Sequence, residues 1–225
     1  MSERSDPPFA WHFESTEVGG RRIELAVASD PDAMLIDACE RQDAGEQGVI
    51  DPFWAATWRA AAGLDRYLGR LDLTGTRVLE LGCGTGHAGI AAAIRGASVT
   101  LTDGVEEPLQ LVRHSVRRLG EIPGQIERVE RLRFGRDRLD LPPWPIVIGS
   151  DVTYLRQLWP DLERCAGHHL DDGGTWLLSD PYRIIANEFV QWIGNHGGWS
   201  YREHRIALED DPDHPIRVME FTRSP

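Results

Sequence analysis

Residues 78–89 read VLELGCGTGHAG, an apolar run that passes directly into a glycine-rich turn. The apolar part predicts a buried strand, and the alanine-rich stretch 89–96 predicts a helix after the turn. Glycines at such a turn let the backbone approach a ligand closely, and the N-terminus of the following helix favours negative charge. The stretch therefore predicts a ligand site between a strand and a helix.

The same letters fit two ligand-binding patterns, which differ in where a carboxylate falls. Read from Gly84 they form G-x-G-x-x-G, the dinucleotide pattern, whereas read from Glu80 an acidic residue precedes the alternating glycines. A carboxylate aimed from Glu80 toward the ligand would repel a pyrophosphate but attract an ammonium. Asp103, at the end of the next expected strand, can bind ribose hydroxyls in either case. The pattern favours S-adenosylmethionine, an adenosine ligand with an ammonium and no phosphate.

Beyond this turn, strand patterns alternate with helix patterns. The alternation predicts a Rossmann-like α/β fold, with a seven-stranded, mostly parallel sheet and helices on both faces. The short loop EDDPDHP (209–215) joins the last two strands, which predicts an antiparallel C-terminal hairpin. The expected strands are 78–81, 98–103, 126–134, 145–151, 175–180, 200–208 and 215–223, and the expected helices are 89–96, 106–119, 155–169 and 184–195.

The first part of the chain is expected to extend this sheet domain. The segment WHFESTEVGGRRIELAVA (11–28) predicts a β-hairpin around two glycines, and a helix is expected over 52–71, after a short helix and loop in 30–50. The predicted divisions are a disordered tail at 1–10, a hairpin and helix extension at 11–71, and an S-adenosylmethionine-binding domain at 72–225.

The composition argues against several classes of function. The formal net charge of −12 disfavours nucleic acid as a partner, because phosphate binding needs a positive surface. All 24 basic residues are arginines, which excludes lysine Schiff-base enzymes and Walker-type phosphate loops. Three well-separated cysteines predict neither a disulfide framework nor a metal site. The lack of a long apolar run and of an apolar N-terminal segment predicts a cytoplasmic protein without a membrane partner.

Three stretches resemble a known family. VLELGCGTG (78–86) resembles the first motif of the class I, seven-strand S-adenosylmethionine-dependent methyltransferases. DPFWAATWRAAAGLDRYL (51–68) and IGSDVTY (148–154) resemble the protein lysine methyltransferases of that class, most of all the branch that modifies the β subunit of electron-transfer flavoprotein. The resemblance implies S-adenosylmethionine as cofactor, S-adenosylhomocysteine as product and a protein lysine as acceptor.

The resemblance also implies roles for individual residues. Asp151, at the end of an expected strand, would bind the incoming amine, while Tyr154 would hydrogen-bond the amine or form the pocket wall. Trp58 would line the cofactor pocket, and Phe134 with Gly135 would cover the adenine, where the family usually has tryptophan. Helix capping stays open for Asp151, and packing for Tyr154. The other expected cofactor contacts are Glu80, Gly82, Cys83, Gly84, Thr85, Gly86, Asp103, Gly104 and Ser150.

Three functions remain open at this level. The first is a protein lysine methyltransferase, and the second is a small-molecule N- or O-methyltransferase, because a fold does not determine its substrate. The third is a cofactor-binding interaction module without catalysis. The segment LRQLWP (155–160) lacks the acidic residues that often follow this motif in the family, which bears on the lysine substrate more than on the cofactor. The sequence does not determine the oligomeric state.

Overall fold

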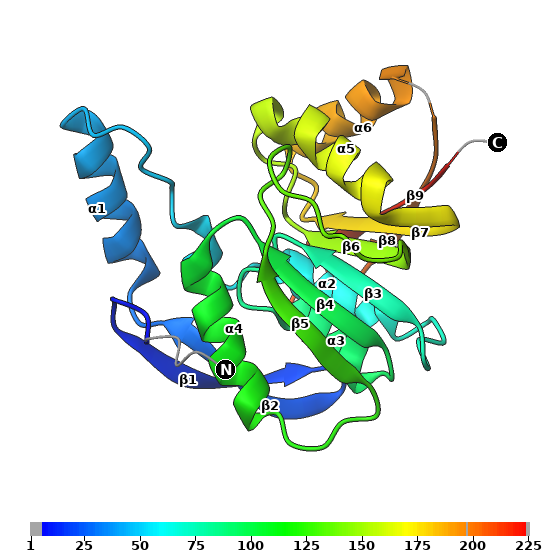
Figure 1. Cartoon of the computed structure of the whole chain (residues 1–225), viewed down its shortest axis with the longest axis horizontal. Coiled ribbons are helices and arrows are strands. Elements are labelled where there is room, and N and C mark those ends of the chain that lie inside the picture. The colour runs from blue at the N-terminus through cyan, green and yellow to red at the C-terminus, as the bar shows by residue number, and fades with distance from the viewer. Residues whose placement is uncertain (1–5, 197, 224–225) are drawn as a thin grey trace.

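The centre of the molecule is a seven-stranded sheet with the order β5-β4-β3-β6-β7-β9-β8 (Figure 1). The computed structural model describes residues 6–196 and 198–223. Neighbouring strands are parallel except β9, which is antiparallel to both β7 and β8. The predicted Rossmann-like sheet and its C-terminal hairpin are therefore confirmed. The strands are β3 (Arg77–Leu81), β4 (Ser98–Asp103), β5 (Gln125–Arg131), β6 (Trp144–Ser150), β7 (Leu170–Asp180), β8 (Trp199–Ile206) and β9 (Ile216–Arg223).

Two apolar layers cover the two faces of this sheet. Successive side chains of a strand point to opposite faces, so Val78 of β3 packs in one layer while Leu79 and Leu81 pack in the other. The first layer lies against α2 (Arg59–Leu68), α3 (His87–Ile94) and α4 (Glu106–Arg118). The second lies against α5 (Trp159–His169) and α6 (Ile184–His196). This alternation decides where each polar residue of a strand end can point.

The N-terminal extension packs on the first of these layers. Its hairpin of β1 (Trp11–Val18) and β2 (Arg21–Ala28) contacts α4, where Ala26 N–H donates to Ser115 Oγ at 2.8 Å. The helix α1 (Pro31–Asp43) stands apart from the sheet, and only its Ala38 is buried (Figure 1).

The predicted disordered tail at 1–10 falls partly outside the described residues, which begin at Asp6. Within them, Phe9 packs against Trp54 with ring centres 5.5 Å apart, and the Ala10 carbonyl accepts the Ser29 N–H at 2.9 Å. Residues 6–10 thus pack on the body of the protein, and the prediction of disorder is wrong for them.

The prediction of a helix over 52–71 is wrong for residues 52–58. A 3-10 turn, η1 (Phe53–Ala55), is followed by extended backbone, and α2 begins only at Arg59. Trp58 precedes α2 with φ −98° and ψ 134°, and its Nε1 donates to the Phe53 carbonyl at 2.7 Å. Tertiary contacts override local helix preference here, because Trp54 and Trp58 line a cavity instead of sharing one helix face.

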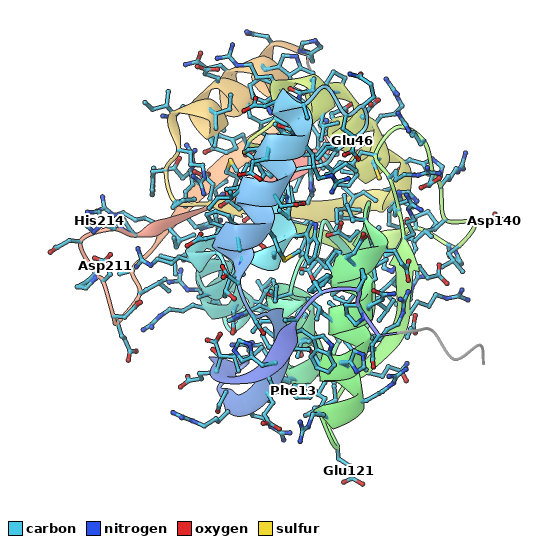
Figure 2. All side chains as sticks on the ribbon, turned by 90° about the vertical axis from the view of Figure 1, so that its left-hand side faces the viewer. Phe13, Glu46, Glu121, Asp140, Asp211 and His214 are labelled. Atoms are coloured by element: carbon cyan, nitrogen blue, oxygen red, sulfur yellow. The ribbon has the colours of Figure 1, made fainter. Side chains whose placement is uncertain are left out.

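The loop between β8 and β9, which carries Asp211 and His214, projects from the body (Figure 2). These two side chains pair with each other at 2.9 Å, and Arg59 of α2 contacts Asp211 at 3.0 Å. The acidic loop is therefore partly neutralised by the chain itself.

Among the helices of the described residues, none combines the length and the apolar composition that a membrane span requires.

Candidate active site

A cavity of about 420 Å³ opens at the carboxyl ends of β3, β4, β5 and β6. The crevice at strand ends is where doubly wound sheets bind ligands, and the volume lies in the usual range of roughly 300–1,000 Å³. Residues 50–61 of the N-terminal extension complete its wall. The site therefore has residues from both sides of the predicted domain boundary at residue 72, and that boundary stays a prediction. The predicted site residues that line it are Trp58, Gly82, Cys83, Gly84, Thr85, Asp103, Gly104, Phe134, Ser150, Asp151 and Tyr154.

The glycine loop turns from β3 into α3 along one side of this cavity. Gly82, Gly84 and Gly86 have φ values of +64°, +49° and +79°, which side chains with a Cβ rarely adopt. A Cβ at Gly84 would meet nothing closer than the Trp54 carbonyl at 3.7 Å, so the backbone of the loop borders open space. Gly86 instead precedes α3 as its N-terminal cap residue and does not line the cavity. At Gly82 and Gly84 the loop thus presents backbone to a ligand.

Asp103 at the end of β4 ties the glycine loop to the next strand. Its Oδ2 accepts the Gly84 N–H at 3.0 Å and its Oδ1 accepts the Val105 N–H at 3.1 Å. Burial raises the pKa of this carboxyl to about 6. Because an ionised carboxylate has about four acceptor positions, each oxygen can still accept a hydrogen bond from a ligand hydroxyl.

Glu80 does not border the cavity, which contradicts the prediction that it faces a ligand ammonium. Its side chain is fully buried beside α3, where Oε2 accepts the Gly89 N–H at 2.9 Å. Strand alternation turns it to this face, and the unpaired N–H groups of the first helical turn supply its partner. Oε1 has no hydrogen-bond partner among the described residues. Burial raises its pKa to about 8, so the carboxyl is mostly protonated at neutral pH.

Replacing Glu80 with glutamine is expected to make the protein more stable than the wild type at high pH. The pKa of Glu80 is raised from 4.5 to about 8 on folding, so this group stabilises the fold fully below pH 4.5 and loses that contribution as the pH rises through 8. Between pH 6 and 8 the difference in unfolding free energy should widen by up to about 1.4 kcal/mol per pH unit. Urea unfolding across this range measures it. Glu17→Gln, at an exposed residue of β1, serves as control, and a pH-independent difference for Glu80→Gln would contradict the raised pKa.

Asp151, immediately after β6, is held in a strained conformation and bonded by an arginine. Its φ is +52°, which is uncommon for a residue with a side chain and is found most often at functional sites. Arg183 donates to both of its oxygens, from Nε to Oδ1 at 2.9 Å and from Nη2 to Oδ2 at 2.7 Å. The sequence reasoning missed Arg183, although its position just after the strand end Ser179-Asp180-Pro181 could have indicated it, because β6 and β7 are neighbours.

Aromatic side chains form the wall of the cavity near Asp151. Phe53 packs edge-on against Tyr154 with ring centres 5.4 Å apart, and Trp58 is hydrogen-bonded to the Phe53 carbonyl. Trp58 and Tyr154 are each 38% exposed, so both rings reach from the cavity to solvent. Burial and the charges of Asp103 and Asp151 raise the pKa of Tyr154 to about 12, which keeps its hydroxyl neutral.

Phe134 and Gly135 follow β5, which ends at Arg131 and not at residue 134 as predicted. Phe134 lines the cavity beside the glycine loop, since a Cβ at Gly82 would lie 3.8 Å from its Cζ. Gly135 has φ +71° and packs against Asp161 of α5, outside the cavity. The structure therefore separates these two neighbours, and only the aromatic ring is placed to cover a ligand.

The donor and acceptor set of the cavity fits an adenosine. The loop backbone allows close approach, Asp103 offers acceptors for hydroxyls, and the Phe134 ring offers a flat apolar surface for a base. Burial raises the pKa of the Cys83 thiol, so Cys83 contributes an uncharged wall and no nucleophile.

Comparison with known proteins gives the family. A family model described as lysine methyltransferase matches residues 39–188. The chain belongs to the lysine methyltransferase family. It is 39% identical over 132 residues to a protein N-lysine methyltransferase, METTL21A, of Danio rerio, covering 55% of this chain and 58% of that one. It is 35% identical over 187 residues to EEF1A lysine methyltransferase 3 of Mus musculus, covering 81% and 78%.

Other comparisons agree with this family and its fold. The electron transfer flavoprotein beta subunit lysine methyltransferase of Xenopus laevis is 33% identical over 146 residues, covering 59% of this chain and 54% of that one. These identities do not single out the branch that the motifs most resemble. The magnesium protoporphyrin IX methyltransferase of Synechocystis, solved with S-adenosylmethionine, shares the fold with a TM-score of 0.54, 21% identity and coverage of 84% and 91%. Membership of this family agrees with the predicted cofactor, S-adenosylmethionine.

Proposed function

We propose that this lysine methyltransferase transfers the methyl group of S-adenosylmethionine to the side-chain amine of a lysine in a protein. The observation that carries the proposal is the buried carboxylate of Asp151 at a cavity that the half-exposed rings of Trp58 and Tyr154 also line. A lysine side chain has a long apolar stem and a cationic head. The rings suit the stem and the carboxylate suits the head. The relatives' names, which specify lysine as the acceptor, support the same substrate class.

The cofactor would lie along the glycine loop. We propose that Asp103 accepts the ribose hydroxyls, that Phe134 covers the adenine, and that the backbone at 82–85 borders the amino-acid part of the cofactor. Gly104 and Ser150 complete the wall beside these groups. When bound, S-adenosylmethionine supplies an electrophilic methyl group on a positively charged sulfur.

The reaction needs a neutral amine held in line with that methyl group, at about 3 Å, so positioning supplies much of the rate. Asp151 would bind the lysine ammonium and hold its nitrogen in place while one proton leaves to solvent. The oxygen of the neutral Tyr154 hydroxyl can then accept an N–H of the amine, which leaves the lone pair free and aimed at the methyl carbon. A nitrogen–carbon bond forms as the carbon–sulfur bond breaks, and S-adenosylhomocysteine leaves.

A labelling experiment tests this proposal. The protein is incubated with S-adenosylmethionine that carries a radioactive methyl group and with a lysate of the organism that encodes the chain. We expect a labelled protein band whose label is recovered as methyl-lysine after hydrolysis, and Asp151→Asn should lose it. Label found only in small molecules would contradict a protein acceptor and would favour a small-molecule methyltransferase. The cytoplasmic location and the absence of a nucleic-acid or membrane partner stay predictions.

A further inference from the structure

The carboxylate that the proposed function assigns to the substrate amine already binds a cation of the chain itself. Arg183 forms a bidentate ion pair with Asp151, with nitrogen–oxygen distances of 2.9 and 2.7 Å. The same guanidinium lies over the ring of Trp58, with its central carbon 5.3 Å from the ring centre. A substrate lysine would need these two partners, a carboxylate and an aromatic face. Arg183 therefore makes the contacts expected of the acceptor.

The exposure of the pair shows that Arg183 covers Asp151 from solvent. The side chain of Arg183 is 38% exposed, whereas that of Asp151 is only 5% exposed. A neighbouring pair, Arg217 with Asp180, is enclosed on both sides, with side-chain exposures of 3% and 0%. Removing Arg217 from its partner would leave a buried charge uncompensated, but Arg183 can turn outward into water. Of these two ion pairs, the one at the cavity is the one that can open.

The backbone at Arg183 is anchored, while its side chain borders solvent. The Arg183 N–H donates to Asp180 Oδ1 at 2.9 Å, and the preceding Tyr182 has the left-handed φ of +58°. The helix α6 begins at the next residue, Ile184. The anchored backbone keeps the guanidinium within reach of Asp151 after it is displaced. When a substrate ammonium replaces Arg183, Asp151 is paired with a cation both before and after the exchange.

We propose that Arg183 is a specificity-determining residue that occupies the acceptor site until a cationic substrate side chain displaces it. The inference rests on the proposed function, because it takes Asp151 as the group that binds the amine. A neutral hydroxyl acceptor cannot replace a guanidinium on a buried carboxylate, whereas an ammonium can. Displacement also costs free energy, which a protein docked through further contacts can supply more readily than a small amine. Arg183 thereby selects lysine side chains presented by a bound protein.

The arginine-only composition of the chain provides a direct test. All 24 basic residues are arginines, so Arg183→Lys introduces the only lysine. The Nζ of lysine is as many bonds from Cα as the guanidinium carbon of arginine, so the new amine can reach Asp151. We expect Arg183→Lys to methylate itself at residue 183 when S-adenosylmethionine is the only addition. Intact mass and peptide mapping measure the added methyl groups, and a rate independent of protein concentration would show transfer within one molecule.

Matched variants make the result specific. Arg66→Lys places a lysine at an exposed ion pair on α2 and should stay unmethylated. The double variant Arg183→Lys with Asp151→Asn should lose the methylation. If the wild type labels lysine in lysate protein and Arg183→Lys binds the cofactor in calorimetry but stays unmethylated, Arg183 does not occupy the acceptor site and the inference is overturned. If the wild type binds no cofactor, the proposed function itself fails.

Discussion

Asp151→Asn is expected to lower the rate of methyl transfer to protein by about 100-fold or more, while S-adenosylmethionine binds nearly as in the wild type. The substitution removes the negative charge that would hold the lysine ammonium and keeps the size of the side chain. Asparagine tolerates the φ of +52° at this position better than most residues, so the turn after β6 should persist. Arg183 loses its partner, but its exposure lets water solvate the guanidinium. Turnover with labelled cofactor and calorimetric binding measure the two effects separately.

The control for this variant is Asp171→Asn, at an exposed residue near the start of β7, which should leave both measurements unchanged. If Asp151→Asn kept normal turnover, the carboxylate would have only a local structural role, as the helix-capping interpretation of the sequence allows. A loss of cofactor binding equal to the loss of turnover would place Asp151 in the cofactor site and not at the acceptor.

Asp103→Ala is expected to weaken S-adenosylmethionine binding by about 100-fold, since each hydrogen bond to a charged group contributes roughly 1.5–3 kcal/mol. The variant removes the proposed acceptor of the ribose hydroxyls. It also frees the Gly84 N–H, whose bond to Asp103 holds the glycine loop against β4, and the Val105 N–H in the turn after β4. The loop then loses part of the shape that lets its backbone border the ligand. Calorimetry at pH 7.5 measures the affinity, and thermal unfolding without ligand reports any loss of stability.

The matched variant Asp103→Asn keeps the shape of the side chain and removes its ionisation. The pKa of Asp103 is raised to about 6, so the carboxyl gains a proton as the pH falls through that value. If only the ionised form binds, wild-type affinity should drop about tenfold by pH 5, and the asparagine variant should lack this pH dependence. A wild-type affinity that stays constant from pH 8 to pH 5 would contradict the assignment of Asp103 to the cofactor.

Much of the fold could be predicted because its signals are local. The strands at 98–103 and 145–151 match β4 and β6 almost residue for residue, since short apolar runs bounded by turns identify buried strands. The prediction of a helix over 52–71 was wrong for its first part because the aromatic residues there line the cavity. No local signal distinguishes aromatic residues that line a cavity from those that pack in a core. The tertiary environment decided the conformation of that segment.

The glycine loop illustrates the same limit within the site. The motif identified the turn and indicated the cofactor of the family, yet the Glu80 carboxylate that was expected to face the ligand points elsewhere. Glu80 lies under the loop because strand alternation directs it to α3, where the Gly89 N–H binds it. The pattern of residue types was informative although the predicted direction of one side chain was wrong.

Local sequence patterns were sufficient for the strand–turn–helix at 78–96, the parallel sheet with its C-terminal hairpin, and the motifs that indicated the family. Three features depend on contacts between distant segments: the direction of Glu80, the wall that residues 50–61 add to the cavity, and the pairing of Arg183 with Asp151. These two residues are 32 positions apart and meet because β6 and β7 are neighbouring parallel strands whose carboxyl ends share one edge of the sheet. Local sequence cannot specify such a contact, because it depends on the order of strands in the sheet.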